Sequence, residues 1–477
     1  MKLRPYQPEA MTEARAAYAA GARGVLVVAP TGSGKPVLAA ACAKSALDRG
    51  GCVLFIVPRR EIVKQTVGKL EALGLDPSIV AAGLDRQRDE RVTVCMAQTM
   101  VRRPADCVKP PTLVIVDEAH LAVADTYRRI FERWPSARSL LLTATPCRTD
   151  GRGLGEIADQ MIETTGTRQL IADGHLVPPV VWSAKTPDMK GIRKTVSGEL
   201  SPKHAGAKYA ASVILGDTLD QIRQRCQGRT VLVFASSVEH SKALRDALKA
   251  EGYKAAHIDG GTNAAIRARV LTCLEAGELD VVTNYGCLTE GLDVPSLGAV
   301  VVARCTQSRA LWFQMVGRGL RPSQDKTDCV VIDQGGNAHR HGHPAASPAW
   351  TLEGKEKQER GDVPTCTTCE QCFAIYERRP DAPGCPRCGA VPVPKPRREI
   401  QQLKRKELAL VVPDPDGNPK PVRPMPDGWY DRGKWEQIER QRIAAGYHWR
   451  WSLHQLQNQG WILRQKFKRL SSWRSAR

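Results

Sequence analysis

The sequence predicts an α/β fold with two parallel-sheet domains in tandem, followed by a small cysteine module and a short, basic, helical C-terminal region. Three observations support this fold class. Apolar runs alternate with helical segments in two separate series, five cysteines crowd between residues 366 and 388, and six of the ten tryptophans fall after residue 427. A chain of 477 residues is also too long for a single hydrophobic core.

The first series of apolar runs lies within residues 24–145. Its members are residues 25–28, 53–57, 92–96, 113–116 and 140–142. Continuous apolar runs that are separated by helical stretches, such as residues 61–73, are typical of a parallel sheet buried on both faces. We therefore predict a first α/β domain over residues 1–184.

The second series begins near Tyr209. Its apolar runs are residues 231–234, 255–258, 281–282, 300–302 and 330–332, separated by helical segments such as 241–251 and 264–276. These runs predict a second α/β domain over residues 205–345. The polar stretch 185–204 contains two prolines and two glycines, and we predict that it is a linker or an exposed insertion.

The regular alternation stops after residue 332. The composition then predicts a cysteine module over residues 363–391, a proline-rich tether over 392–427 and a tryptophan-rich helical tail over 428–477. Residues 391–477 hold 19 Lys and Arg against 8 Asp and Glu, and the whole chain has a net charge of +20. This excess favours a polyanionic partner.

Composition also predicts the cellular environment. No run reaches the roughly 18 apolar residues of a membrane span, and the N-terminus lacks the apolar core of a signal peptide. We therefore predict an intracellular protein with no membrane partner. Ten of the fifteen cysteines are scattered singly, which indicates reduced thiols.

Two motifs indicate a nucleotide site. Residues 29–35 read Ala-Pro-Thr-Gly-Ser-Gly-Lys, and such a glycine-rich turn between a strand and a helix lets backbone N–H groups surround phosphates while Lys35 reaches the terminal ones. Asp117 and Glu118 follow another apolar run, where an acidic pair can hold magnesium and position water. The plainer alternative is that this pair caps the next helix.

One residue departs from this pattern. The position after Lys35 is Pro36, where Ser or Thr would supply a hydroxyl to magnesium and a backbone N–H to the phosphates. Proline is tolerated in the first turn of a helix, so we expect the fold to persist while the chemistry weakens. Both slow hydrolysis and no hydrolysis are compatible with this change.

A third motif, Gln-Met-Val-Gly-Arg-Gly-Leu-Arg at residues 314–321, completes the set. With it, residues 3–333 resemble the superfamily 2 helicases and translocases of bacterial and bacteriophage DEAH type. The resemblance implies two RecA-like domains that hydrolyse ATP with Mg²⁺ in the cleft between them. The implied catalytic residues are Lys35, Asp117, Glu118, His120, Arg318 and Arg321, with Asp117 as the magnesium ligand.

The resemblance also implies roles for the catalytic groups. Glu118 orients or deprotonates the attacking water, and His120 links the hydrolysis site to the nucleic-acid groove. Arg318 and Arg321, three apart on a predicted helix, would act as arginine fingers on the γ-phosphate. The alternative for the two arginines is a solvated basic face.

Further contacts follow from the same resemblance. The residues implied to bind ATP are Arg4, Gln7, Thr31, Gly32, Ser33, Gly34, Lys35, Gly291 and Asp293. Those implied to bind nucleic acid are Arg59, Arg60, Gln98, Thr99, Thr262 and Thr289, and contacts of this kind hold phosphates without reading sequence.

The cysteine module has the spacing of a two-knuckle zinc ribbon. Tetrahedral Zn²⁺ needs two closely spaced pairs of thiolates. Five cysteines compete for four places, and we favour Cys369, Cys372, Cys385 and Cys388, with Cys366 as a substitute. Chance clustering and a redox dithiol are the alternatives. The histidines at 339, 341 and 343 also resemble metal ligands, but a polar loop is the preferred explanation.

The tail tryptophans have two explanations that the sequence leaves open. Interleaved with Arg and Lys, they could stack on unpaired bases. Alternatively, several form a small core together with residues such as Ile438 and Ile443. The tail is also a candidate surface for a protein partner.

The combined prediction is an ATP-dependent helicase or translocase that tracks along DNA in the cytoplasm of a bacterium or a bacteriophage-infected host. DNA is preferred over RNA by resemblance alone. Two alternatives are an ATP-binding clamp in which Pro36 impairs hydrolysis, and the motor subunit of a restriction-like complex.

Overall fold

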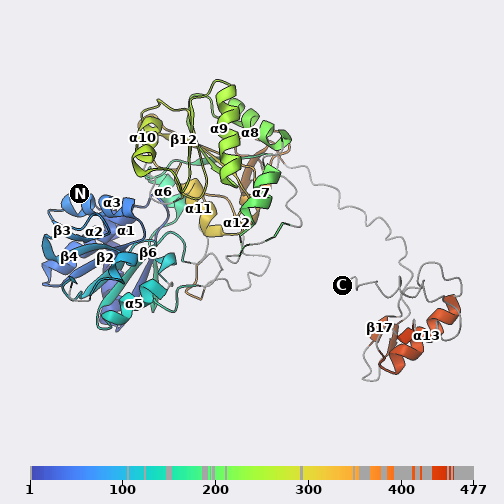
Figure 1. Cartoon of the computed structure of the whole chain (residues 1–477), viewed down its shortest axis with the longest axis horizontal. Helices are drawn as coiled ribbons and strands as arrows, with labels where there is room; N and C mark the ends of the chain where they lie inside the picture. The colour runs from blue at the N-terminus through green and yellow to red at the C-terminus, as the bar shows by residue number, and fades with distance from the viewer. Residues whose placement is uncertain are drawn as a thin grey trace. The chain divides into compact units, whose positions relative to one another are not determined.

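The computed structural model describes residues 3–104, 107–122, 125–146, 153–184, 192–193, 195, 199–209, 212–289, 294–346, 350–353, 366–377, 384–391, 411–413, 419–421, 432–447, 451–452 and 455. The chain divides into two compact units, Met1–Pro392 and Val393–Arg477. The first unit contains two α/β lobes, each built on its own sheet (Figure 1).

The first lobe is built on a parallel sheet of seven strands in the order β3-β4-β2-β5-β6-β1-β7. The strands are β1 (Gly24–Val28), β2 (Val53–Val57), β3 (Pro77–Val80), β4 (Asp89–Met96), β5 (Leu113–Val116), β6 (Arg138–Thr143) and β7 (Gln160–Glu163). All five predicted apolar runs are strands of this sheet. The two edge strands, β3 and β7, were not predicted.

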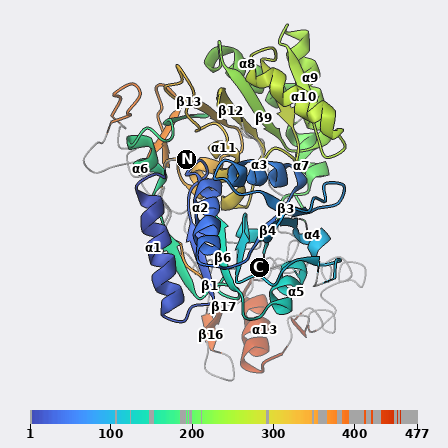
Figure 2. The ribbon, with the colours of Figure 1, turned by 90° about the vertical axis from the view of Figure 1, so that its left-hand side faces the viewer.

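Helices cover both faces of this sheet. They are α1 (Tyr6–Ala19), α2 (Lys35–Asp48), α3 (Arg60–Glu71), α4 (Ala97–Met100), α5 (Asp125–Arg133) and the 3₁₀ helix η2 (Ala119–Leu121). Val25 and Val27 pack with α1, α2 and α3, whereas Leu26 and Val28 pack with α4 and α5. Alternate residues of one strand therefore enter two separate cores, as expected for a sheet buried on both faces. Figure 2 shows helices α1 to α5 around the strands of this sheet.

The second lobe has an eight-stranded sheet in the order β10-β11-β9-β12-β13-β8-β15-β14. The strands are β8 (Pro179–Ser183), β9 (Thr230–Ala235), β10 (Ala255–Ile258), β11 (Val281–Asn284), β12 (Leu297–Ala303), β13 (Cys329–Asp333), β14 (Cys366–Thr368) and β15 (Ala374–Glu377). The first six are parallel, whereas β15 and β14 are antiparallel additions. The five predicted runs form β9 to β13.

Strand β8 changes the division of the chain. It precedes the predicted boundary at residue 184, yet it pairs with β13 in the second sheet. The chain therefore passes from one sheet to the other between β7 and β8, through α6 (Thr167–Ala172). Since β15 pairs with β8, the cysteine module continues the sheet of the second lobe.

The helices of the second lobe are α7 (Pro202–Tyr209), α8 (Ser212–Arg225), α9 (Val238–Ala250), α10 (Ala264–Glu275), α11 (Arg309–Gly317) and α12 (Asn337–His341). Glu199, near the end of the predicted linker, bonds to the backbone at the start of α11. Glu199 Oε1 accepts hydrogen bonds from the backbone N–H groups of Gln307 and Ser308, at 3.0 and 2.9 Å, just before α11 begins. This part of residues 185–204 is therefore anchored to the second lobe.

The second unit contains a two-stranded sheet and one helix among its described residues. Strands β16 (Val411–Pro413) and β17 (Pro419–Pro421) pair antiparallel within the segment predicted to be a tether. Helix α13 (Arg432–Ala444) buries Trp435, Ile438 and Ile443. At Trp435 the structure therefore favours the small-core explanation; Trp429, Trp449, Trp461 and Trp473 lie outside the described residues.

Two predictions about chemistry and environment can be compared with the structure. Within the described part of the chain, no disulfide joins the cysteines. No helix in that part is both long and apolar enough to cross a bilayer.

Candidate active site

The phosphate loop connects the end of β1 to the start of α2. Gly32 and Gly34 adopt left-handed φ angles of 84° and 83°, a conformation that glycine reaches without steric cost. Gly34 is the residue before the helix. In the first turn of α2, Pro36 has no N–H and the Val37 N–H donates to Gly34 O at 2.9 Å, so this helix start offers fewer backbone donors to an anion than usual. Residues 29–35 form the predicted turn between a strand and a helix, and phosphate binding by it stays a prediction.

Residues of the N-terminal segment hold this loop from outside. The amide of Gln7 donates to the carbonyl oxygens of Ser33 and Gly34 at 3.4 and 3.2 Å, and the hydroxyl of Tyr6 donates to Ser33 as well. Gln7 is 1% exposed. Its amide therefore braces the loop, whereas Arg4 lines the cavity that the loop borders.

Lys35 lies in the first turn of α2 with its side chain buried. Its Nζ donates to the carbonyl oxygens of Ala29 and Pro30, at 3.0 and 3.3 Å. Burial holds the pKa of Lys35 below its usual value, although the nearby carboxylates of Glu118 and Asp117 oppose this shift. The Lys35 ammonium group is therefore hydrogen-bonded to the backbone of the phosphate loop, close to the carboxyl groups of Asp117 and Glu118.

Asp117 and Glu118 follow directly after β5. Burial, followed by the charge of Glu118, raises the pKa of Asp117 to about 7. Glu118 takes a left-handed φ of 53°, which is uncommon for a residue with a side chain. Its side chain makes no capping hydrogen bond to η2, so the structure gives no support to the capping alternative.

His120 connects the acidic pair to the end of β6. Its Nδ1 lies 3.4 Å from Glu118 Oε2 and 3.4 Å from Thr143 Oγ1. The Thr143 hydroxyl in turn donates to the carbonyl oxygen of Thr145 at 2.9 Å. A continuous polar path therefore runs from the acidic pair to residues 143–145.

Arg318 and Arg321 reach the site from the second lobe, but not from a common helix as predicted. Helix α11 ends at Gly317, and Arg318 is already its C-cap residue. Gly319 is closely packed, because an added Cβ would lie 2.4 Å from Cys329 Sγ. The backbone turns after Gly317, and both arginines nevertheless line the same cavity.

These groups converge on one cavity of about 570 Å³, which we name the ATP cleft. Its lining combines the phosphate loop, the acidic pair and the two arginines, namely Arg4, Thr31, Gly32, Gly34, Lys35, Pro36, Asp117, Glu118, Arg318 and Arg321. Residues on the exposed side of α3, including Lys64 and Lys69, also line it. The sequence did not identify these two lysines, although the apolar spacing of α3 leaves them opposite its buried side.

Pro36 is exposed and lines the ATP cleft at the start of α2. Of the two nearby hydroxyl residues, Ser33 is 1% exposed and its Oγ has no hydrogen-bond partner among the described residues. Ser33 does not line the cleft, whereas Thr31 does. Thr31 is therefore the hydroxyl residue of the loop that faces the site.

The predicted nucleic-acid residues fall into two groups. In the first lobe, Arg60 Nη2 donates to Gly83 O at 3.1 Å and Thr99 Oγ1 accepts from Ala82 N at 3.4 Å, so a shared loop brings these two together. Arg59 precedes α3, and Gln98 is exposed on α4.

In the second lobe, Thr262 bonds with Asp259 beyond the end of β10. Thr289 is 9% exposed, and its carbonyl oxygen accepts from Arg318. Gly291 and Asp293 lie outside the described residues.

The cysteine module brings four thiols together. The Sγ atoms of Cys369, Cys372, Cys385 and Cys388 lie within 4.8 Å of one another, and two of these pairs are 3.6 and 3.7 Å apart. Four sulfurs bound to Zn²⁺ at about 2.3 Å would be separated by roughly 3.8 Å. The donor set therefore fits tetrahedral zinc, and Cys366 lies apart in β14, paired with Glu377.

The histidines of residues 339–343 make other contacts. His339 bonds with the carbonyl oxygen of Cys366 and with Thr368 Oγ1, at 3.1 and 2.9 Å. His341 Nε2 lies 3.0 Å from Thr306 O. Among the described residues, the four cysteines form the one group of three or more His, Cys, Asp or Glu side chains that could hold a metal ion, and the histidines are not part of it.

The fold and the cavity define a class of protein: two RecA-like lobes that together line one cleft. Matches to family models identify the family within this class. The type III restriction enzyme res subunit model matches residues 1–148, and the helicase conserved C-terminal domain matches residues 215–323. The chain belongs to the superfamily 2 helicases.

Individual relatives agree with this assignment. A 51.5 kDa protein of Lactococcus phage (isolate 7-9) is 29% identical over 74% of this chain and 75% of its own length. A Saccharomyces cerevisiae protein provisionally named the ATP-dependent helicase IRC3 is 28% identical over 69% of this chain and 51% of its own length. The chain therefore spans about half of this yeast relative.

A solved structure is similar in fold. The ATP-dependent Type ISP restriction-modification enzyme LlaBIII, bound to DNA, matches with a TM-score of 0.53 and 18% identity. The match covers 70% of this chain and 28% of that enzyme.

Proposed function

We propose that this protein is an ATP-dependent motor that acts on DNA and hydrolyses ATP in the cleft between its two lobes. The observation that carries the proposal is the convergence of a phosphate loop, an acidic pair and two arginines on one cavity of about 570 Å³. Because the arginines come from the second lobe, a nucleotide in this cleft would contact both lobes. Binding and release of the nucleotide could then move one lobe relative to the other.

Each group has a role that its position allows. The backbone N–H groups of the phosphate loop and the Lys35 ammonium would hold the phosphates, and Arg318 and Arg321 would stabilise the charge that develops on the transferred phosphoryl group. Glu118, oriented by His120, would hold the attacking water and accept its proton.

The acidic pair also fits a divalent cation. Asp117 is 8% exposed, and its raised pKa reflects burial next to a second carboxylate, an arrangement that a cation would relieve. Magnesium, when bound there, supplies charge neutralisation for the phosphates. On the loop side, the Pro36 side chain offers no oxygen, so we propose that Asp117 is the main protein group that holds the metal.

Three observations support DNA as the substrate. The fold resembles that of a restriction-modification enzyme solved with DNA, and the first family model describes a restriction enzyme subunit. The net charge of +20 favours a polyanion. We propose that Arg59, Arg60, Gln98, Thr99, Thr262 and Thr289 line the DNA path, and that the protein acts inside the cell, where DNA is found.

The decisive experiment is ATP turnover by the purified chain with and without single-stranded DNA. We expect DNA to stimulate turnover and Glu118→Gln to abolish it while ATP binding persists. Stimulation of ATP turnover by RNA but not by DNA would show that the substrate is RNA. Turnover that survives in Glu118→Gln would overturn the proposed site.

The second candidate is a clamp that binds ATP and DNA without efficient hydrolysis. Pro36 favours this candidate, because the loop lacks a magnesium ligand at this position. DNA binding that depends on ATP, together with turnover that appears only in Pro36→Thr, would select the clamp. Equal turnover in both chains would exclude it.

A third candidate is the motor subunit of a restriction-like complex. The match to a res subunit over residues 1–148 favours it. Such a subunit would purify together with a nuclease or methyltransferase partner, and ATP-dependent DNA cleavage would appear only in that mixture. The basic tail is the surface that we propose for such a partner.

We further propose that Cys369, Cys372, Cys385 and Cys388 bind a structural Zn²⁺. The short distances between their sulfurs support this site. Arg387 lies between Cys385 and Cys388, and its guanidinium carbon is 5.7 Å from the ring centre of Trp182 on β8. Because this contact joins the cysteine module to β8, a bound metal would stabilise that edge of the second lobe.

A further inference from the structure

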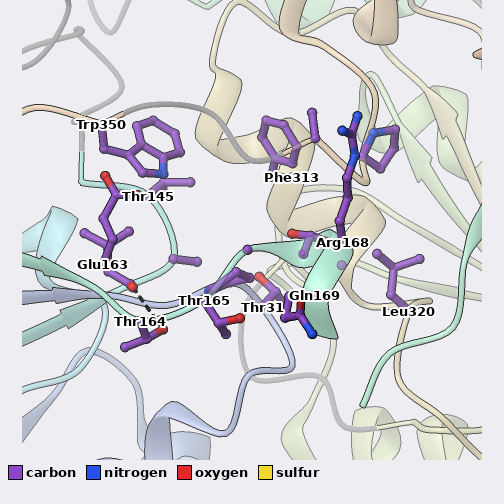
Figure 3. A pocket seen from close by; sticks show the side chains of 18 residues that line it. Thr31, Thr145, Glu163, Thr164, Thr165, Arg168, Gln169, Phe313, Leu320 and Trp350 are labelled. Atoms are coloured by element: carbon purple, nitrogen blue, oxygen red, sulfur yellow. Dashed lines mark hydrogen bonds between the residues drawn. The ribbon is translucent and has the colours of Figure 1, made fainter. Parts of the chain in front are cut away.

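A second cavity, of about 480 Å³, borders the phosphate loop. We name it the interlobe pocket, because its lining comes from Thr31, Thr145 and Glu163 of the first lobe and from Phe313 and Leu320 of the second, together with Trp350 (Figure 3). Its volume lies within the range of about 300–1,000 Å³ that is typical of small-molecule sites.

The interlobe pocket shares a wall with the ATP cleft. Thr31 lines both cavities. In the turn after α11, Gly317 and Leu320 line the interlobe pocket, whereas Arg318 and Arg321 line the ATP cleft. A molecule in the pocket would therefore touch the same two segments that enclose the nucleotide.

Two aromatic rings form one side of the pocket. In Figure 3 the rings of Trp350 and Phe313 lie across the cavity from Thr164 and Thr165. The Arg309 guanidinium lies 6.0 Å from the ring centre of Phe313 and 5.4 Å from that of Trp350, which helps to fix both rings. Rings held in this way provide stacking surfaces for a flat ligand.

The other sides carry hydroxyl groups and a carboxyl group. Five threonines line the pocket, namely Thr31, Thr145, Thr164, Thr165 and Thr167. Thr145 is 1% exposed, and its Oγ1 has no hydrogen-bond partner within the described chain. A buried hydroxyl without a partner is unfavourable, and a ligand that bonds to it would remove this penalty.

Glu163 adds an acidic group to the lining. Glu163 is exposed, but partial burial still raises the pKa of its carboxyl group, and the Trp350 backbone N–H opposes this shift by donating a hydrogen bond. Arg168, which also lines the pocket, is paired with Glu377. The Glu163 carboxylate is therefore the acidic group of the lining that a positive amine would meet.

We propose that the interlobe pocket binds a flat aromatic molecule that carries an amine, and that this binding increases the affinity of the ATP cleft for nucleotide. The ring stacks against Phe313 and Trp350, and the amine donates to Glu163 and the threonine hydroxyls. The ligand bridges the phosphate loop and α11, so it favours the arrangement in which both lobes face the nucleotide. The binding of this ligand is argued from the interlobe pocket alone, whereas its effect on nucleotide affinity depends on the proposed ATP site.

The test uses 9-aminoacridine, a fluorescent flat cation without phosphates, with acridine as the matched ring that lacks the amine. In nucleic-acid-free solution at pH 8, we expect saturable binding of 9-aminoacridine, at least tenfold tighter than that of acridine. Glu163→Gln and Thr145→Val, which preserve size, should each weaken binding about five- to tenfold. Asp117→Asn, which removes a carboxylate that could hold the cation in the ATP cleft, should leave it unchanged.

Several outcomes would overturn the proposal. These are the absence of saturable binding, equal binding of the two rings, or binding that is lost in Asp117→Asn but kept in Glu163→Gln and Thr145→Val. In the last case the ring occupies the ATP cleft. Normal melting curves of the variants exclude misfolding as the cause.

The coupling is measured as the affinity for ADP with and without saturating 9-aminoacridine. We expect an increase of about fivefold or more. Unchanged ADP affinity would overturn the coupling. Absence of ADP binding under both conditions would instead overturn the proposed function, so the two failures are distinguishable.

Discussion

The guanidinium of Arg318 donates two hydrogen bonds to the carbonyl oxygen of Thr289, from Nε at 2.9 Å and from Nη2 at 2.7 Å. Arg318 is 6% exposed and lines the ATP cleft at the same time. Thr289 is one of the residues predicted to contact nucleic acid. One side chain therefore joins the nucleotide site to the proposed DNA path, within a single lobe.

This relationship predicts that Arg318→Lys uncouples the two sites. Lysine keeps the charge but cannot direct two N–H groups from one plane at the same oxygen. We expect stimulation of ATP turnover by single-stranded DNA to fall by about 10²–10³-fold. The measurement is the ratio of turnover with DNA to turnover without it.

Arg321→Lys is the matched control, because it makes the same change on the other arginine of the cleft. We expect it to slow turnover but to keep the stimulation ratio. If the two variants have the same ratio, the bond between Arg318 and Thr289 does not carry the coupling.

A second prediction concerns Pro36→Thr. Threonine restores both a hydroxyl and an N–H to the cleft, worth about 2–4 kcal/mol in the barrier, so we expect ATP turnover to rise roughly 30- to 1000-fold. Pro36 is exposed, so the melting temperature should change little. Turnover is measured at several magnesium concentrations, and we expect the variant to need less magnesium.

The control for this change is Pro36→Ala, which removes the ring and restores the N–H without adding a hydroxyl. An equal rise in Pro36→Ala and Pro36→Thr would show that the proline ring or the missing N–H, rather than the missing hydroxyl, limits the chemistry. No rise in either variant would mean that the loop functions as it stands.

A third prediction follows from the burial of Asp117. Its pKa rises from 3.8 to about 7 in the folded protein. Between these values the folded state keeps a proton that the unfolded state has lost, so the stability contributed by this group falls as pH increases and is lowest above pH 7. Without nucleotide or metal, Asp117→Asn should melt a few degrees higher than the parent chain at pH 8, with a smaller difference near pH 4.

Asp48→Asn is the control for this pH dependence, since the side chain of Asp48 is 61% exposed. It should have almost no effect at either pH. A gain in melting temperature for Asp117→Asn that is equal at pH 4 and pH 8 would contradict the proposed ionisation.

The sequence predicted the central strands of both sheets because each is a continuous apolar run. Edge strands such as β7, with the sequence Gln-Met-Ile-Glu, are short and partly polar, so they have no such pattern. The sheet to which β8 belongs depends on pairing between residues that are far apart in sequence. Apolar patterning alone therefore could not place the division between the lobes.

For the candidate site, local motifs predicted the chemistry better than the geometry. The phosphate loop and the acidic pair are short contiguous motifs, and they occupy the predicted strand ends. The α-helix predicted to carry Arg318 and Arg321 ends at Gly317, and residues 318–320 continue in turns in which each N–H donates to the carbonyl oxygen three residues before. That the Thr145 hydroxyl is buried without a hydrogen-bond partner in the described chain could not be predicted, because its surroundings come from segments distant in the chain.

The last prediction concerns the cysteine module. Cys369 and Cys385 are 5% and 2% exposed and pack in the same core as Trp182 and Val233 of the second lobe. Because β15 also pairs with β8, loss of metal should loosen one edge of that lobe. We expect Cys372→Ser to abolish stoichiometric zinc and to lower stability by at least ~3 kcal/mol, since structural zinc contributes directly to folding.

Cys366→Ser is a control within the same module. Cys366 lies in β14, outside the group of four sulfurs, so this variant should keep one zinc per chain, as measured by elemental analysis, and a melting temperature close to that of the parent. If Cys366→Ser lost zinc and Cys372→Ser kept it, Cys366 would be a ligand and the proposed set would be wrong. If both kept zinc, the remaining thiols would hold the ion with an exchangeable fourth ligand, and the cluster would not need all four cysteines.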